Sequence, residues 1–250
     1  EIASCLVGSE MCIRDRCWDM GQATFRNDMY TSYKQNRPAP PDELIPQFDY
    51  VKDISEQFGF VNIGVANYEA DDVIGTLAKI YSKDNEVHIV TGDRDILQCI
   101  NEQVEVWLIR KGFNIYHHYT LNRFNEEYAL HPLQLIDIKA FMGDSADGYP
   151  GVKGIGEKTA IKLIQSYGSV ENVLDNIESL TPNQQKKIAI DKENLILSKQ
   201  LAKIYTDVPI DTTALYEEMK YTHSLNHILS ICNEHELYVS GKYLASKILM

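Results

Sequence analysis

The sequence predicts an α/β fold in which a parallel sheet with helical cover is followed by an all-helical region. Three observations support this prediction. Up to about residue 120, short β-type runs alternate with amphipathic runs of helical spacing, a pattern typical of parallel sheets. Beyond residue 121 only helical spacing remains. The 250 residues are enough for one large domain or two small ones with a substantial core.

The elements of the first region follow from their apolar spacing and from the residues that interrupt it. Residues 21–41 are polar and end in a proline-rich stretch, so we expect a connector with at most a short helix. Apolar residues then recur at helical spacing from Asp42 to Gly59, which predicts an amphipathic helix. The remaining elements are, in order, a strand at 60–66, a helix at 73–81, a strand at 87–90, a helix after Gly92 that carries Ile96 and Ile100, and a strand at 104–109.

The second region is predicted to be a series of helices. Their ranges are 132–142, 157–167, 170–176 and about 182–204, with two further helices near the C-terminus. This change of pattern places a boundary near residue 120. We therefore predict domains at 17–120 and 121–250.

Net charge and cysteine content limit the classes of function. The chain carries 36 Asp and Glu against 24 Lys and Arg, a net charge of −12, which by itself argues against a nucleic-acid partner. Its five cysteines form no C-x-x-C pair, so we expect a reducing cytoplasm rather than a disulfide framework or a structural zinc site. No apolar run approaches the roughly 18 residues of a membrane span, and no secretory signal is evident.

Acidic residues gather at three places where the predicted fold delivers side chains to one edge of the sheet. One place begins a helix after a strand, the second lies at the carboxyl end of the strand at 87–90, and the third follows the helix at 132–142. The residues are Glu69, Asp71 and Asp72, then Asp93 and Asp95, then Asp144 and Asp147, with the isolated Asp19 as a fourth contributor. Ligands that are all oxygen favour hard cations such as Mg²⁺ or Mn²⁺ over zinc.

Simpler explanations compete at two of these places. Asp93 is equally well explained as a helix cap, because acids in a first helical turn complement the helix dipole. The isolated Asp19 is better explained as a solvated or capping acid. Three acids within four residues, from Glu69 to Asp72, are different, since like charges so close repel unless a cation or a proton intervenes. We therefore expect this cluster to bind a cation.

A glycine-rich segment between two predicted helices, Gly148 to Ala160, resembles a helix-hairpin-helix. Its glycines allow backbone amides to approach a phosphate, and the N-terminus of the following helix adds its positive end. Lys153, Lys158 and Lys162 can reinforce this contact, which binds the nucleic-acid backbone without reading base sequence. A plain helix connector is the simpler alternative, but the length and the lysine pattern favour a phosphate clamp.

Three long motifs occur in the order Tyr68 to Ile74 (YEADDVI), Thr91 to Gln98 (TGDRDILQ) and Phe141 to Ala160 (FMGDSADGYPGVKGIGEKTA). Together they resemble the 5′ nuclease family, which includes the 5′-3′ exonuclease domain of bacterial DNA polymerase I and the phage and bacterial flap endonucleases. The resemblance covers roughly residues 17–240. It implies a PIN-like α/β nuclease domain, a helix-three-turn-helix DNA clamp at about 132–167, and hydrolysis of phosphodiesters at 5′ flaps or 5′ ends of DNA by two metal ions.

The resemblance also implies roles for individual residues. One Mg²⁺, for which Mn²⁺ can substitute, would lie among Asp19, Glu69, Asp71 and Asp72, and a second among Asp93, Asp95, Asp144 and Asp147. Lys34 and Arg37, in the run Tyr33 to Pro38, would meet the scissile phosphodiester as catalytic residues, and Arg26 would contact the DNA backbone. The hairpin contacts to DNA would come from Gly151, Lys153, Gly154, Gly156, Lys158, Thr159 and Lys162, with K⁺ bound at the hairpin. The implied protein is a monomer without a membrane partner, in the cytoplasm of a bacterial or phage-infected cell.

Two departures from the family pattern bear on these expectations. Family members begin with an apolar strand that carries a metal-binding Asp, followed by a long helix, before the strand that ends near Asp19. Residues 1–16 do not resemble this segment, so we interpret them as foreign sequence and the chain as N-terminally truncated. Gly148 stands where the family usually has Asn. Because this Asp is missing, a module that binds branched DNA without cutting it is an alternative function. A PIN-type ribonuclease is a third.

Overall fold

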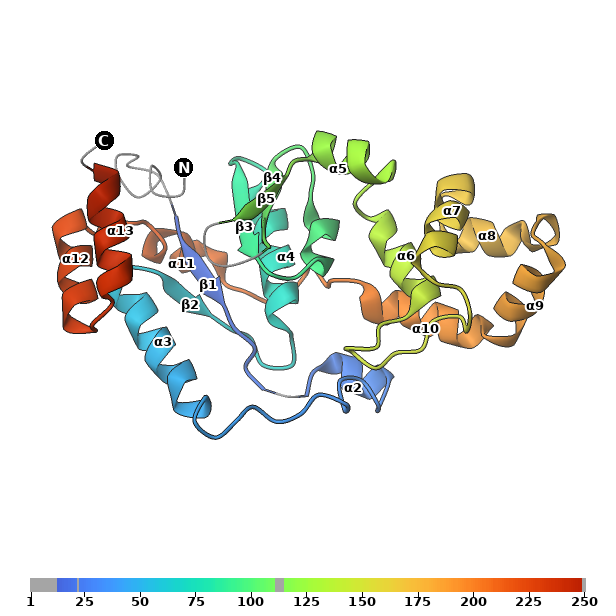
Figure 1. Cartoon of the computed structure of the whole chain (residues 1–250), viewed down its shortest axis with the longest axis horizontal. Coiled ribbons are helices and arrows are strands. Elements are labelled where there is room, and N and C mark those ends of the chain that lie inside the picture. Colours follow the sequence, from blue (N-terminus) through green and yellow to red (C-terminus); the bar gives the residue numbers. More distant parts are fainter. Residues whose placement is uncertain (1–12, 22, 111–114, 249–250) are drawn as a thin grey trace. The chain divides into compact units, whose positions relative to one another are not determined.

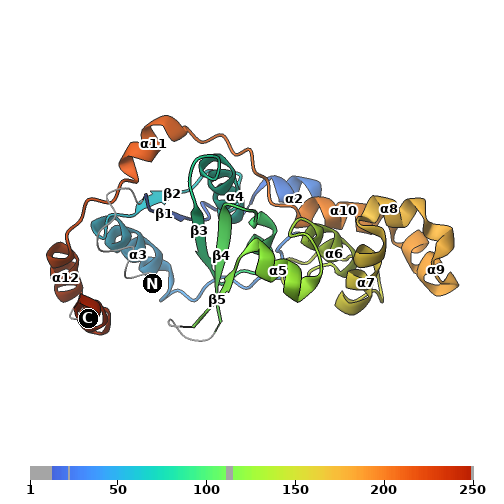
Figure 2. The same ribbon diagram turned by 90° about the horizontal axis from the view of Figure 1, so that it is seen from above.

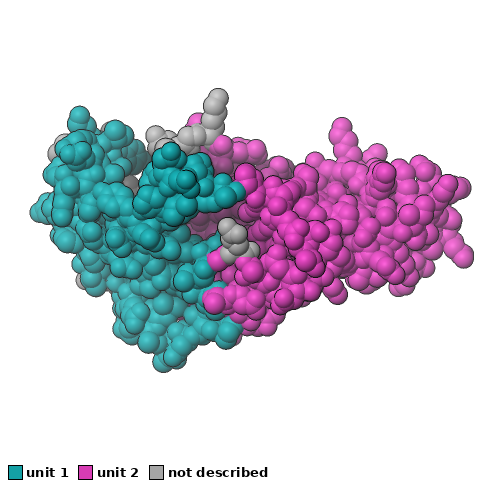
Figure 3. Space-filling view, turned by 90° about the horizontal axis from the view of Figure 1, so that it is seen from below, with its two compact units in different colours: residues 1–20, 39–65, 209–250 teal, residues 21–38, 66–208 magenta. Residues whose placement is uncertain are grey.

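The computed structural model describes residues 13–21, 23–110 and 115–248 (Figures 1 and 2). The chain forms two compact units, which are coloured separately in Figure 3. The first comprises residues 1–20, 39–65 and 209–250, and the second comprises residues 21–38 and 66–208. None of the helices in the described ranges is both long enough and apolar enough to cross a bilayer.

The first unit pairs two short strands and adds helices from both ends of the chain. Its elements are β1 (Asp15–Cys17), α3 (Ile45–Gln57), β2 (Val61–Ile63), α11 (Thr212–Glu218), α12 (Leu225–Glu234) and α13 (Tyr238–Ile248). The strands are parallel, with Asp15 opposite Val61. The helix α3 ends just before Gly59, whose φ of +80° is a conformation that glycine adopts at little cost. A small apolar cluster centred on Ile231 and Cys232 lies on α12.

The second unit begins with a three-stranded sheet. Its elements up to residue 128 are α2 (Phe25–Met29), α4 (Ala70–Tyr81), β3 (Val87–Thr91), the 3₁₀ helix η1 (Asp95–Cys99), β4 (Val104–Ile109), β5 (Tyr116–Tyr119) and α5 (Leu121–Tyr128). The pair β3 and β4 is parallel and the pair β4 and β5 is antiparallel. The buried face of the sheet carries Val104, Val106 and Tyr119, which belong to the main apolar core.

The helical part of this unit continues the same core. Its elements are α6 (Gln134–Met142), α7 (Glu157–Tyr167), α8 (Val170–Asp175), the 3₁₀ helix η2 (Ile177–Ser179), α9 (Pro182–Ile190) and α10 (Lys192–Ala202). The helix α6 packs against both α7 and α10. Phe141, Ile164 and Leu195 are fully buried, so one apolar core joins the sheet to the helices.

Several elements differ from the sequence-based expectation. The strand β5 and the helix α5 were not predicted, although Thr120 is an N-cap whose side chain accepts a hydrogen bond from the Arg123 amide. The expected helix at 182–204 is interrupted at Asp191, where the backbone leaves helical geometry (φ −105°, ψ 23°). The helix expected after Gly92 is only the short 3₁₀ turn η1. After residue 208 the described chain forms three helices rather than two.

Candidate active site

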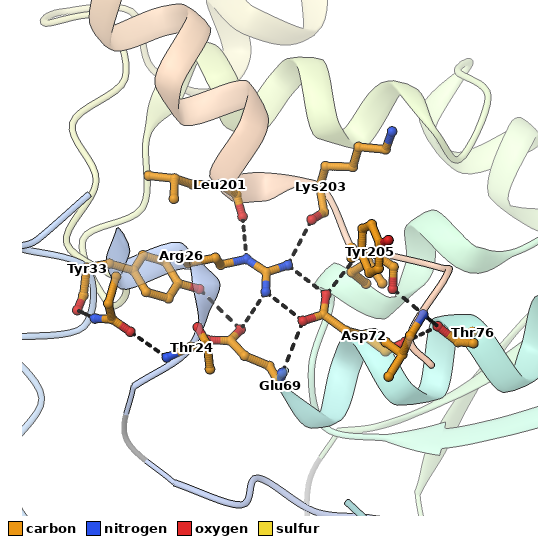
Figure 4. A network of polar contacts seen from close by, with 12 residues as sticks. Thr24, Arg26, Tyr33, Glu69, Asp72, Thr76, Leu201, Lys203 and Tyr205 are labelled. Atoms are coloured by element: carbon orange, nitrogen blue, oxygen red, sulfur yellow. Dashed lines mark hydrogen bonds and ion pairs between the residues drawn. The ribbon is translucent and has the colours of Figure 1, made fainter. Parts of the chain in front are cut away.

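The N-terminus of α4 is organised by a buried carboxylate. Glu69 is the N-cap, and the Asp72 side chain accepts a hydrogen bond from the Glu69 amide at 3.0 Å. Asp72 is 0% exposed, and its two oxygens also accept from the Tyr205 amide and from Arg26. Figure 4 shows these donors converging on the Asp72 carboxylate. Both Asp72 oxygens are thus occupied by donors of the protein itself, which speaks against the predicted role of Asp72 as a metal ligand.

Arg26 is the cation of this buried network. Its Nη1 and Nη2 donate to the two oxygens of Asp72 at 2.7 and 2.8 Å, and Nη1 lies 3.6 Å from Glu69 Oε2. Its Nε and Nη2 also donate to the carbonyls of Leu201 and Lys203. Arg26 is 2% exposed, and its acidic neighbours outweigh burial and raise the pKa of the guanidinium. The side chain is therefore a core residue, and the predicted contact with the DNA backbone is inconsistent with its burial.

Glu69 and Asp147 are joined by a short cationic loop, residues 33–37. The hydroxyl of Tyr33 donates to both carboxylates at 3.2 Å. Lys34 Nζ donates to Glu69 at 2.7 Å, and Arg37 Nη2 donates to Asp147 at 2.5 Å. Burial and the two carboxylates raise the pKa of Tyr33, so the phenol keeps its proton and remains a donor. The two predicted catalytic cations, Lys34 and Arg37, are thus each hydrogen-bonded to a predicted metal ligand.

The backbone of this loop is unusual at Lys34, whose φ is +56°. A non-glycine residue in this left-handed region is uncommon and such residues concentrate at functional sites. The Lys34 amide donates to the Asp147 carbonyl at 2.8 Å, and the Asn36 side chain donates to the Ser145 carbonyl. These bonds hold the predicted connector against the loop that follows α6. The segment is therefore more ordered than its polar composition predicts.

A second group of acids is held together by Lys139 of α6. The Lys139 ammonium contacts Asp95 at 2.7 Å and Asp144 at 2.5 Å. Burial lowers the pKa of such an ammonium, but the two carboxylates outweigh it and raise the pKa of Lys139. Burial raises the pKa of Asp95, which Lys139 offsets only in part. The pKa of Asp144 is lowered despite burial, because Lys139 and the amides of Ala146 and Asp147 donate to its carboxylate.

The remaining predicted ligands have different surroundings. Asp93 is exposed, and its carboxylate accepts a hydrogen bond from the Asp95 amide at 2.8 Å, although the residue at the N-cap of η1 is Arg94 and not Asp93. Asp71 is half-buried at the start of α4. Asp19 is exposed and belongs to the first unit, whereas the other seven acids belong to the second. Of the seven acids, Asp72 is fully buried, Glu69 is buried at 8% exposure, and the other five are half-buried or exposed.

The structure does not gather three or more His, Cys, Asp or Glu side chains into a metal-binding arrangement within residues 13–21, 23–110 and 115–248. The ion pairs give a physical reason, since Lys139 lies between Asp95 and Asp144, Arg26 between Glu69 and Asp72, and the Tyr33 hydroxyl between Glu69 and Asp147. Like charges repel unless such a group lies between them. The donor chemistry nevertheless fits a hard cation, because Lys139 already places one positive charge between Asp95 and Asp144.

The predicted hairpin lies between α6 and α7 and is built on glycines. Gly151 has a φ of +60°, and a Cβ there would lie 2.2 Å from the Gly143 amide nitrogen, so only glycine fits. Gly154 also has a positive φ, and Gly156 is the N-cap of α7. Lys153, Lys158 and Lys162 are exposed. Gly148, at the position where the family usually has Asn, has a φ of +78°, which both residue types tolerate.

Sequence reasoning missed Lys139 and the Tyr33 hydroxyl. Lys139 lies in an otherwise apolar stretch of α6 between the buried Ile138 and Ala140, and a lysine among buried neighbours signals a carboxylate partner. Tyr33 gives no such signal, because a tyrosine in a polar segment is explained equally well by packing. It is only 3% exposed and stacks on Tyr149.

Models of the two domains of one family match the chain in succession. The N-terminal resolvase-like domain of 5′-3′ exonucleases matches residues 14–129, and the C-terminal SAM fold of 5′-3′ exonucleases matches residues 130–224. A 5′-3′ exonuclease of Bacillus subtilis (strain 168) is 47% identical over 221 residues, which are 88% of this chain and 74% of that protein. DNA polymerase I of Lactococcus lactis subsp. lactis (strain IL1403) is 43% identical over 198 residues, 78% of this chain but 23% of the polymerase.

Solved structures share the fold at lower identity. T5 5′-exonuclease with bound divalent ions (zinc) is 24% identical with a TM-score of 0.64, over 75% of this chain and 73% of that one. The catalytic core of Rad2 in complex with a DNA substrate is 15% identical with a TM-score of 0.53, over 88% and 72% of the two chains. At these identities the likeness establishes the fold.

A resolvase-like α/β domain with clustered carboxylates, continued by a helical domain with a glycine hairpin, defines the class of PIN-like nucleases. Within that class, the chain belongs to the 5′-3′ exonuclease family. This membership confirms the predicted fold class, the resemblance to the 5′ nuclease family and the class of activity. The comparisons do not support the non-cutting alternative.

The family match begins at residue 14 and β1 begins at Asp15, both inside the range 1–16 that we interpreted as foreign. Residues 1–12 lie outside the described residues. The domain bounds at 17–120 and 121–250 remain a prediction.

Proposed function

We propose that this chain hydrolyses phosphodiester bonds at 5′ flaps and free 5′ ends of DNA, with divalent metal ions as cofactors. The observation that carries the proposal is the cationic loop at residues 33–37, which is bonded to carboxylates of two separate segments, Glu69 and Asp147. Cations placed beside carboxylates suit a site that must hold both metal ions and an anionic diester. The family membership supports the same activity.

The residues that would hold metal follow from exposure and partners. Asp72 is left out, because Arg26 and two amides occupy its oxygens. We propose two Mg²⁺, with Mn²⁺ as a substitute, held by Glu69, Asp71, Asp95, Asp144 and Asp147, with Asp93 as a further ligand. Two bound ions would lower the pKa of the attacking water and stabilise the leaving oxygen of an in-line displacement.

The chain's own cations would then bind the substrate. Lys34 and Arg37 are 20% and 52% exposed at their side chains, so both can turn from their carboxylates to a phosphodiester. The hairpin and α7 would hold the duplex backbone through amides and the exposed Lys158 and Lys162. We also propose K⁺ binding at the hairpin, a monomeric protein and action in the bacterial cytoplasm.

Cleavage of a fluorescently labelled 5′-flap duplex tests this function. We expect cleavage with Mg²⁺ or Mn²⁺ and none in excess EDTA, and at least a roughly hundredfold lower kcat for Asp144→Asn. Asp207→Asn is the matched control, because Asp207 is an exposed acid that pairs only with the exposed Lys79 in the ion pairs of the described chain. Cleavage that persists in EDTA, or in Asp144→Asn at the wild-type rate, would contradict the proposal. A flap made of RNA distinguishes the ribonuclease alternative.

A further inference from the structure

The helix α10 lies between the hairpin and the buried acids, and it is bonded at both ends. Toward its N-terminus, the Asp191 side chain accepts a hydrogen bond from the Lys153 amide at 2.9 Å. In the middle of the helix, at the seventh of its 11 residues, the buried Ser198 hydroxyl accepts from the Gly151 amide at 3.1 Å. Both donors belong to the glycine hairpin. The hairpin backbone is therefore attached to α10 at two points, seven residues of sequence apart.

The C-terminal end of the same helix is attached to the acids by Arg26 (Figure 4). The Leu201 carbonyl, in the last turn of α10, accepts from Arg26 Nε at 3.1 Å. The Lys203 carbonyl, one residue beyond the helix, accepts from Arg26 Nη2 at 2.8 Å. Nη1 and Nη2 of the same guanidinium donate to the Asp72 carboxylate, which also accepts a hydrogen bond from the Glu69 amide. All of these residues belong to the second compact unit.

Arg26 is suited to this connection by its shape. A guanidinium presents five donors in a rigid plane, so one side chain can bind a carboxylate with two donors and still reach two carbonyls. Burial removes competing water, and Arg26 and Asp72 are 2% and 0% exposed. A lysine at the same position would keep the charge but could not satisfy all four acceptors in one plane.

We propose that Arg26 is a positioning residue that sets the distance between the DNA-binding hairpin and the carboxylate of Glu69, with α10 as the rigid spacer. From Asp191 to Leu201 the helix rises roughly 15 Å, and from Ser198 to Leu201 roughly 4.5 Å, at 1.5 Å per residue. A duplex held at the hairpin is then placed at a constant distance from Glu69, and this distance decides which phosphodiester is cut. The inference rests on the proposed nuclease function and adds a determinant of the cut position.

The test is the distribution of product lengths from a 5′-flap duplex, read at single-nucleotide resolution. For Arg26→Lys we expect products at two or more neighbouring positions where the wild type gives one main product, and a kcat about tenfold lower. The Kd for the uncut flap, measured by fluorescence anisotropy with Ca²⁺ in place of Mg²⁺, should stay within about twofold of the wild-type value, because the hairpin itself is unchanged.

Gln98→Leu is the matched control for loss of stability. Gln98 is 6% exposed and bonds the Ala202 carbonyl and the Ile204 amide, the same chain segment, without touching an acid or the hairpin. This variant should keep a single main product even if its melting temperature falls as far as that of Arg26→Lys. Equal spreading of products in both variants, or a single unshifted product in Arg26→Lys, would overturn the inference.

A second variant keeps the test decisive if Arg26→Lys does not cut. Ser198→Ala removes the bond from the Gly151 amide to the middle of α10 and leaves the bond from the Lys153 amide to Asp191 in place. We expect it to spread the products as well, and an unchanged product pattern would count against the inference. Failure of the wild type to cut with Mg²⁺ would reject the proposed nuclease function instead, so the two failures are distinguishable.

Discussion

The buried network around Arg26 and the partly exposed network around Lys139 both join acids to a cation, but they differ in how far the acid and its cation are exposed to solvent. Asp72 receives four hydrogen bonds, two from Arg26 and one each from the amides of Glu69 and Tyr205. Asp95 accepts from Lys139, a flexible ammonium whose side chain is 23% exposed. An acid of the first kind is part of the core, whereas one of the second kind can exchange its partner for a metal ion.

The sequence alone does not reveal this difference. Asp71 and Asp72 are adjacent and chemically identical, yet only Asp72 is fully buried. Burying an ionised carboxylate is costly unless every oxygen is satisfied. The comparison therefore teaches that full burial of the acid together with its cation, rather than its place in an acidic motif, marks Asp72 as a structural acid.

The largest effect is expected where the buried network is broken. Arg26→Met leaves Asp72 charged and without its cation, which should lower the free energy of unfolding by about 3–5 kcal/mol. Lys79→Met is the control, because Lys79 and Asp207 are 51% and 66% exposed and such pairs contribute at most about 1 kcal/mol. Urea unfolding followed by circular dichroism measures both values. Similar losses in the two variants would mean that burial does not distinguish the networks.

An intermediate effect is expected where the partly exposed network is opened. Lys139→Met removes the ammonium that competes with a divalent ion for Asp95 and Asp144. The two carboxylates should then bind Mn²⁺ severalfold more tightly, since an opposing positive charge is removed at short range. Isothermal titration of the protein with Mn²⁺ measures this change. Lys162→Met, on the exposed face of α7, should leave Mn²⁺ binding unchanged, and weaker binding in Lys139→Met would show that Lys139 supports the site rather than competes for it.

The smallest effect is expected at a third ion pair, on the surface. Lys199 donates to Glu171 at 2.7 Å and lowers the pKa of that carboxyl, although burial partly opposes the shift. A lowered carboxyl pKa contributes stability above its ordinary pKa of 4.5, and this contribution is lost as the pH falls through the lower folded value. Because Glu171 is 63% exposed, solvent screening keeps the contribution within about 1 kcal/mol.

Unfolding of Glu171→Gln at several pH values checks this third pair, because Lys199→Met would also leave the buried Asp137 without its cation. The variant should be slightly less stable than the wild type at pH 7, and the difference should shrink as the pH falls below 4.5. A difference that grows toward acid pH would contradict this account of the pair.

Local sequence patterns predicted the helices whose caps and apolar stripes are self-contained. The helix predicted at 157–167 is observed with these bounds, since Gly156 precedes α7 and Gly168 follows it. The strand predicted at 104–109 is also observed with these bounds, and its buried residues alternate with less buried ones. The helix α5 was missed although Thr120 caps it, and η1 was expected to be longer than a 3₁₀ turn. Boundaries set by a single backbone angle, such as the break at Asp191, have no comparable sequence signal.

The sequence by itself determined the family, the fold class, the acidic motifs and the hairpin, because each is written in contiguous residues with their own spacing. The tertiary structure alone decided which of these residues share a site. It placed Arg26 in the core, bonded to residues more than 170 positions away, and it placed Lys139 between two acids. The physical reason is that burial and pairing of charges depend on contacts between distant segments, and those contacts decide whether an acid stabilises the fold or remains available to a metal ion.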